Sequence, residues 1–85
     1  MDLTKYANKI PQPPELTIGK YQHYKGKMYE VLGVGAHTES LEFFVIYKPL
    51  YEKPGSDFWI RPYEMFIESV EVDGVSIPRF QKVQD

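Results

Sequence analysis

The sequence predicts an all-β fold, a small and strongly bent barrel of five to six short strands with one helical turn. The first observation is composition: the 85 residues include seven Tyr, five Phe, one Trp and seven Pro. Aromatic residues favour strands, and Pro favours turns. The second observation is that short apolar segments alternate with turn signals from residue 19 onward. Strands this short would expose unpaired edges unless the sheet closed into a barrel.

Chain length and charge restrict the class of protein further. At 10.0 kDa the chain forms one domain, and burial of roughly 64% of the unfolded surface suffices for a core without cross-links. The absence of Cys excludes disulfides and thiolate metal sites and suits a reducing compartment. The net charge of −2 does not indicate a polyanionic partner. Long apolar segments and a secretory signal are both lacking, so we expect a cytoplasmic protein with no membrane partner.

The first 18 residues differ in composition from the rest of the chain. They hold three Pro between positions 11 and 14 and a single aromatic residue. We expect one helical turn near residues 4–9, followed by a polyproline-like segment. Such an arm is either a loosely draped terminus or a strap over the barrel or a partner chain. We therefore divide the chain into an extended N-terminal arm, residues 1–18, and a barrel domain, residues 19–85.

The first half of the predicted barrel contains three strands, which we expect over residues 20–24, 28–36 and 41–48. Gly33 and Gly35 inside the second strand predict a bulge, a sharp bend or a close approach of another backbone. The third strand has apolar residues on both faces, which indicates a barrel or a packed dimer. A two-residue turn at Gly26-Lys27 places Tyr24 opposite Tyr29 and His23 opposite Glu30, although a three-residue loop fits equally well.

The second half begins after a loop over residues 50–57. We expect a strand over residues 58–61, a helical turn over 62–66 that starts with Pro, and two strands over 67–72 and 75–80. Asp73-Gly74 between alternating apolar residues is a strong hairpin signal. It places Val72 opposite Val75 and Val70 opposite Ile77. The same register brings Glu68 beside Arg79, where the opposite charges attract.

Several motifs between residues 19 and 80 carry a family resemblance. They are Gly19-Lys20-Tyr21-Gln22-His23-Tyr24-Lys25-Gly26-Lys27-Met28-Tyr29-Glu30-Val31, Ala36-His37-Thr38-Glu39, Val45-Ile46-Tyr47-Lys48-Pro49-Leu50-Tyr51, Trp59-Ile60-Arg61-Pro62, Met65-Phe66, Val70, Val72-Asp73-Gly74 and Pro78-Arg79-Phe80. Together they resemble the bacterial family known as domain of unknown function 1653. The resemblance implies an SH3-like β-barrel in a cytoplasmic protein. It implies no established activity and therefore supplies no catalytic residues.

Metal and catalytic chemistry find little support in the sequence. A transition-metal site would need both histidines, His23 and His37, together with a carboxylate such as Glu39 or Glu30, and no ligand spacing is present. We therefore expect no metal and no cofactor. One alternative is a small enzyme or enzyme accessory in which His37, Glu39 and His23 meet in a concave pocket. The other interpretation makes His23 a partner of Glu30 and His37 a turn residue.

Nucleic-acid binding is a second alternative. Residues 20–29 interleave three Lys with three Tyr, and small barrels bind single strands through aromatic side chains beside basic groups. The net charge of −2 argues against this class. A solvated hairpin with core tyrosines explains the same pattern.

The function that we favour is a non-enzymatic binding module. Trp59 and Arg61 share one face of a short strand, whereas Phe58 and Ile60 on the other face form the expected core pair. Trp, Tyr and Arg are enriched in interface hot spots, and aromatic grooves bind extended Pro-rich peptides. The predicted ligand-binding residues are Trp59, Arg61, Tyr47, Tyr51, His37, Glu39 and His23.

The expected partner is a protein, a peptide or a small molecule. A homodimer is a further possibility, with the third strand and the N-terminal arm in the contact. The contrasting interpretation of the same residues is structural. In it, Trp59 packs in a small second core and Arg61 pairs with Glu64 or Glu68.

Overall fold

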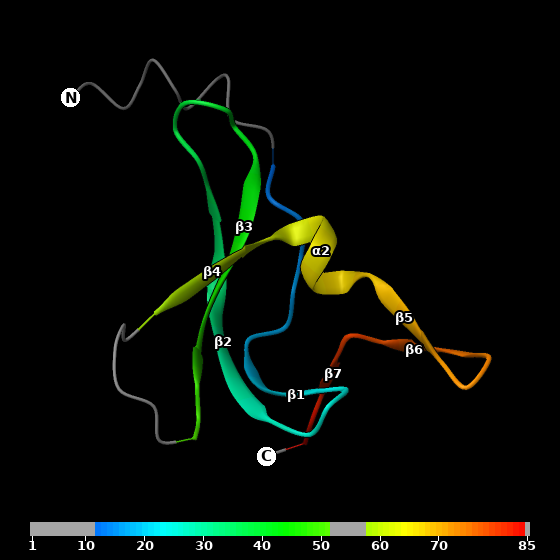
Figure 1. Cartoon of the computed structure of the whole chain (residues 1–85). Helices are drawn as coiled ribbons and strands as arrows, with labels where there is room; N and C mark the ends of the chain where they lie inside the picture. The colour runs from blue at the N-terminus through cyan, green and yellow to red at the C-terminus, as the bar shows by residue number, and fades with distance from the viewer. Residues whose placement is uncertain (1–11, 52–57, 85) are drawn as a thin grey trace.

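The computed structural model describes residues 12–51 and 58–84, and it is mostly β with one short helix (Figure 1). Its elements are β1 (Gly19–His23), β2 (Met28–Ala36), β3 (Phe43–Pro49), β4 (Trp59–Pro62), α2 (Tyr63–Ile67), β5 (Ser69–Val72), β6 (Val75–Pro78) and β7 (Phe80–Lys82). The predicted all-β class is confirmed. The described residues contain seven strands, not five to six, because the last predicted strand divides at Arg79 into β6 and β7. No helix in the described ranges is long and apolar enough to cross a membrane.

The strands form two antiparallel sheets. One has the order β4-β3-β2-β1-β7, and the other is the β5–β6 hairpin, which projects from the body of the molecule (Figure 1). Within the described residues β4 and β7 are the edges of the larger sheet and do not pair, so hydrogen bonds do not close a barrel. Side-chain packing instead connects α2, which follows the edge strand β4, with the other edge strand, β7. Phe66 of α2 is 1% exposed. Its ring stacks on that of Phe80 in β7, with 4.2 Å between the ring centres, and its centre lies 5.6 Å from the ring centre of Tyr47 in β3.

The turn between β1 and β2 differs from the two-residue alternative. Tyr21 lies opposite Tyr29, and Gln22 lies opposite Met28. The backbone amide of Gly26 donates to the His23 carbonyl at 2.7 Å, and Gly26 has φ of 109°. This is a three-residue loop that needs glycine at its left-handed position. The predicted pairing of His23 with Glu30 is therefore wrong.

Two other local predictions are confirmed. The register of β2 against β3 shifts between Val31 and Gly33, which is the bulge that the glycines indicated. The β5–β6 register places Val72 opposite Val75. Asp73 and Gly74 both have positive φ, at 52° and 80°. Positive φ at both central residues is the geometry of the type I′ turn that Asp-Gly favours.

The core consists mainly of aromatic side chains. Its buried members are Tyr21, Tyr29, Val31, Val45, Tyr47, Phe66 and Phe80. Five of these seven are Tyr or Phe, so packing of aromatic rings accounts for most of the core. Edge-to-face contacts between such rings add to the free energy of burial.

Strand β4 presents the face opposite to the one expected. It pairs with β3 so that Trp59 lies opposite Tyr47 and Arg61 lies opposite Val45. Directly opposed residues share a face, and both β3 residues are buried, so Trp59 and Arg61 lie on the core side. The predicted core pair is therefore wrong and is largely exposed to solvent: Phe58 at 58% and Ile60 at 63%.

The described part of the N-terminal arm lies against the domain. Residues 12–18 lead into β1 without regular secondary structure. Leu16 packs on the core, and the Tyr21 hydroxyl donates a 2.6 Å hydrogen bond to the Thr17 carbonyl. The helical turn expected near residues 4–9 and most of the 50–57 loop lie outside the described residues.

Candidate binding site on the core side of the sheet

Tyr29 of β2 is the centre of a cluster of aromatic rings. The centre of its ring lies 5.5 Å from the ring centre of Tyr47, 5.6 Å from that of Tyr51, 5.9 Å from that of Trp59 and 5.7 Å from that of Phe80. The hydroxyls of Tyr29 and Tyr51 are hydrogen-bonded at 3.2 Å. Burial, and secondarily this hydrogen bond, raises the pKa of Tyr29. Tyr29 therefore remains a neutral phenol at physiological pH.

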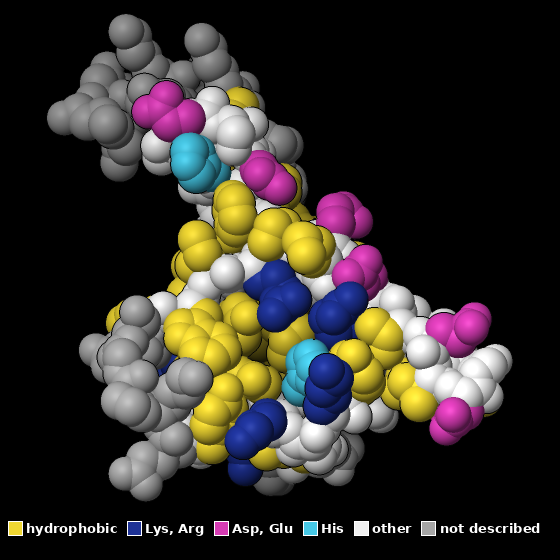
Figure 2. Space-filling view, viewed as in Figure 1, with side chains coloured by type: hydrophobic (Ala, Val, Ile, Leu, Met, Phe, Trp, Pro, Cys, Tyr) yellow, Lys and Arg dark blue, Asp and Glu magenta, His cyan; other side chains and the backbone are white. Residues whose placement is uncertain are grey.

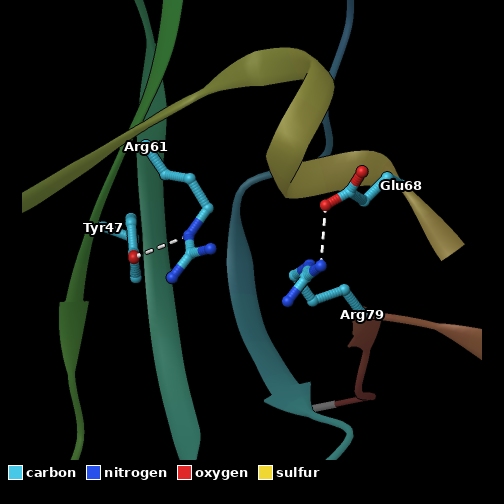
Figure 3. A network of polar contacts seen from close by, with 4 residues as sticks. All are labelled: Tyr47, Arg61, Glu68 and Arg79. Atoms are coloured by element: carbon cyan, nitrogen blue, oxygen red, sulfur yellow. Dashed lines mark hydrogen bonds and ion pairs between the residues drawn. The ribbon is translucent and has the colours of Figure 1, made fainter. Parts of the chain in front are cut away.

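Arg61 places a cation against this cluster. Its Nε donates a 3.2 Å hydrogen bond to the Tyr47 hydroxyl, as drawn in Figure 3. Its guanidinium carbon lies 5.5 Å from the centre of the Phe80 ring, within cation–π range. Within residues 12–51 and 58–84, no carboxylate forms an ion pair with Arg61, so the alternative pairing with Glu64 or Glu68 is not observed.

Arg79, between β6 and β7, is a second guanidinium nearby. Its Nη2 donates to Glu68 Oε1 at 2.7 Å, which is the predicted ion pair. Its Nε is buried and has no hydrogen-bond partner in the described part of the chain. Figure 3 shows both side chains, with Arg61 coming from β4 and Arg79 from the junction of β6 and β7. Only Arg79 has its charge balanced by a described carboxylate.

His23, at the end of β1, adjoins both arginines. Burial lowers the pKa of His23, and the positive charges of Arg61, Arg79 and Lys25 lower it further. The imidazole is therefore neutral at pH 7. Its Nδ1 accepts a hydrogen bond from the Lys25 backbone amide at 3.2 Å, so the ring proton lies on Nε2. The ring also packs edge-on against Phe80 at 4.9 Å.

We call His23, Tyr29, Tyr47, Tyr51, Trp59, Arg61, Arg79 and Phe80 the cationic aromatic site. Figure 2 shows Lys and Arg side chains and one histidine gathered around a hollow that is floored by hydrophobic side chains. The Lys27 ammonium extends the positive surface, since its Nζ lies 4.5 Å from the centre of the Tyr51 ring. Most acidic side chains in that view lie away from this patch, and one adjoins its edge (Figure 2).

Comparison with known proteins places the chain in a family. The model of the family described as "Protein of unknown function (DUF1653)" matches residues 19–82. The chain belongs to this family. A crystal structure of a DUF1653 protein from Bordetella bronchiseptica is 33% identical, with a TM-score of 0.75 over 81% of this chain and 88% of that chain. No curated protein matches the chain.

The matched segment of this DUF1653 chain runs from the first residue of β1 to the last residue of β7. It includes every member of the cationic aromatic site. It does not include residues 12–18, although Leu16 packs on the core. The site is thus contained in the family domain and not in the arm.

His37 and Glu39 lie away from the other predicted site residues. They are in the turn after β2, whereas His23 ends β1, just before the turn that leads into β2, and the nine residues of β2 extend for about 30 Å. The two histidines are correspondingly far apart in Figure 2. His37 Nδ1 accepts hydrogen bonds from the Glu39 and Ser40 backbone amides at 3.1 and 3.2 Å. His37 is therefore a turn residue, and the pocket of His37, Glu39 and His23 required by the enzyme alternative is not formed.

Sequence reasoning predicted seven ligand-binding residues. The structure brings five of them together, namely Trp59, Arg61, Tyr47, Tyr51 and His23, and places His37 and Glu39 elsewhere. Sequence reasoning missed three members of the site, Tyr29, Arg79 and Phe80. Tyr29 shares the face of the buried Val31, two positions along the strand, so alternation within β2 was an available signal. For Arg79 the sequence indicated only the ion pair with Glu68.

Proposed function

We propose that this domain is a non-enzymatic binding module whose ligand contacts the cationic aromatic site. The observation that carries the proposal is the environment of Arg61. A guanidinium has five N–H donors, and only the Nε of Arg61 has a hydrogen-bond partner among the described residues. A cation held against apolar rings without a described counter-charge is suited to a ligand that supplies one.

The residue types support a recognition role. Trp, Tyr and Arg are over-represented at positions that dominate binding energy. Trp59 is half-buried, so part of its ring is available to a ligand while Tyr29 and Tyr47 fix its position. The expected ligand classes remain a small molecule, a peptide or a protein. The bacterial and cytoplasmic setting implied by the family resemblance is part of this proposal.

We also propose that the larger sheet is an SH3-like barrel opened between its edge strands. Support comes from the strand order β4-β3-β2-β1-β7 and from the single helical turn that follows β4. In this architecture the β5–β6 hairpin is an insertion between the helical turn and the final strand. The binding site then lies where the two unpaired edges face each other.

The sole tryptophan provides the test. Trp59 fluorescence is recorded while the full chain is titrated with a panel of metabolites and short peptides. We expect a ligand that changes Trp59 emission in the wild type to bind Arg61→Gln much more weakly. It should bind Ile60→Thr normally, because Ile60 lies on the opposite face of the same strand and is 63% exposed. Equal affinity of the ligand for the wild type and Arg61→Gln would show that Arg61 does not contribute to binding.

A further inference from the structure

Among the described residues, the polar groups left without a partner at the cationic end of the site are donors. Within that part of the chain Arg61 retains its two Nη groups, because Tyr47 occupies only its Nε. His23 retains Nε2–H, because the Lys25 amide occupies Nδ1. The only carboxylate paired at this end among the described residues is that of Glu68, and its Oε1 is bonded to Arg79. A set of donors with excess positive charge favours an oxygen anion over a cation or a neutral carbonyl.

We propose, on the basis of the proposed function above, that the cationic aromatic site binds an organic anion in which a carboxylate or phosphate is attached to a flat ring. The oxyanion contacts the Arg61 Nη groups and His23 Nε2–H, and the ring packs against Trp59. A planar guanidinium matches two oxygens of one carboxylate or phosphate, which a lysine ammonium does not. The hydrogen bond from Nε to Tyr47 orients the guanidinium of Arg61 before the ligand binds.

The charges around His23 give the proposal a second support. The groups that face this imidazole are Arg61 from β4, Arg79 from the β6–β7 junction and Lys25 from its own turn, together with the rings of Tyr24, Tyr29 and Phe80. All three charged groups are positive, and they disfavour the imidazolium. A bound anion would offset that repulsion and raise the pKa of His23. Ligand binding and protonation of His23 are then linked.

The ring half of the ligand is inferred from the aromatic side. Trp59 lies 6.0 Å from Tyr47 and 5.9 Å from Tyr29 between ring centres, so its orientation is fixed by packing. Lys27 lies over Tyr51 at the border of the same surface. A flat apolar group placed beside Trp59 would leave its anionic substituent within the reach of Arg61, which follows two residues later on the same face.

The test uses the full chain and four probes: benzoate, phenyl phosphate, inorganic phosphate and benzamide. The pKa values of both histidines are measured by NMR with and without each probe. We expect benzoate or phenyl phosphate to raise the pKa of His23, to leave that of His37 unchanged and to alter Trp59 emission. Neutral benzamide should not shift His23. Whichever of benzoate and phenyl phosphate binds with the higher affinity identifies the carboxylate or the phosphate as the preferred group.

Two variants separate charge from site geometry. Arg61→Gln should weaken binding of the preferred ring anion about tenfold or more, since hydrogen bonds to charged groups are strong. Lys48→Gln, which removes a cation from the outer face of β3, should change binding less than about twofold. Arg61→Lys should bind at an intermediate level, because lysine keeps the positive charge but cannot donate two parallel hydrogen bonds to one oxyanion group.

Three outcomes would overturn the inference. The first is that neither ring anion shifts the pKa of His23, and the second is that benzamide binds as tightly as benzoate. The third is that inorganic phosphate binds as tightly as phenyl phosphate, which would show that the ring does not contribute to binding. If the fluorescence screen finds an Arg61-dependent ligand that is uncharged, the binding module stands and the anion inference fails. The two proposals are thereby distinguishable.

Discussion

The Nε of Arg61 donates a 3.2 Å hydrogen bond to the hydroxyl of Tyr47, and this contact joins the charged and aromatic halves of the candidate site. Tyr47 is 3% exposed, so its ring is fixed by the core while its hydroxyl reaches the arginine. A buried core residue thus positions a side chain that faces the ligand site.

Removal of the Tyr47 hydroxyl should leave the Arg61 side chain less firmly positioned without disturbing the core. Tyr47→Phe keeps the ring and leaves Nε unpaired, so we expect a loss of about 1 kcal/mol in the free energy of unfolding. Urea denaturation measures this loss. Tyr63→Phe is the matched control, because no hydrogen bond to the Tyr63 hydroxyl is present among the described residues, and it should change stability by less than about 0.5 kcal/mol. Equal losses in both variants would contradict the role given to the Tyr47 hydroxyl.

Phe66 should be among the residues that stabilise the fold most. It is 1% exposed and stacks on Phe80, so it connects α2 with β7, where strand pairing does not close the sheet. Phe66→Ala should cost about 3–5 kcal/mol through lost burial and a cavity. Met65→Ala on the same helix is the control, because Met65 is 46% exposed. Chemical denaturation that gave similar midpoints for the two variants would show that α2 does not support the core as described.

The β1–β2 turn should require glycine at position 26 for backbone reasons alone. Gly26 has φ of 109°, and a Cβ there would meet no atom within 4 Å. Gly26→Ala should therefore destabilise by about 1–2 kcal/mol through strain, not through a clash. Gly33→Ala provides the comparison, because that site has the same open space and an ordinary φ. Thermal unfolding should give a lower Tm for Gly26→Ala than for Gly33→Ala, and the reverse order would contradict the turn assignment.

Stability should fall as the medium becomes acidic, in part because of His23. Its folded-state pKa lies below the ordinary value of 6.5, so the unfolded chain binds more protons than the folded chain as pH decreases through 6.5. The free energy of unfolding therefore declines from pH 6.5 downward until the folded-state pKa is passed. His23→Gln should flatten this decline below pH 6.5. Urea titrations at several pH values compare this variant with the wild type.

Local sequence signals were sufficient where the chain interacts with its own neighbours. Asp73-Gly74 predicted the hairpin, its register and the contact between Glu68 and Arg79, because positive φ at two adjacent positions selects a type I′ turn. The glycines of β2 predicted its bulge. The turn at Gly26 was ambiguous because one glycine is compatible with two loop lengths.

The face of β4 was not predictable from its own four residues. Alternation correctly grouped Trp59 with Arg61, but a preference for apolar residues in the core assigned that pair to the outside. The structure reverses this assignment, because Trp59 and Arg61 pair with the buried Tyr47 and Val45 of β3. The arginine is accommodated on the core side because its guanidinium has both a hydroxyl and an aromatic ring as neighbours.

The sequence by itself determined the all-β class, the hairpin, the bulge and the family resemblance, because each depends on residues that are adjacent in the chain. Only the tertiary structure decided that His23, Arg61 and Arg79 surround one aromatic cluster while His37 and Glu39 stand apart. The physical reason is that a strand's pattern defines two faces but not which face is buried. That choice follows from pairing between distant segments and from the packing of α2 across the open side of the sheet.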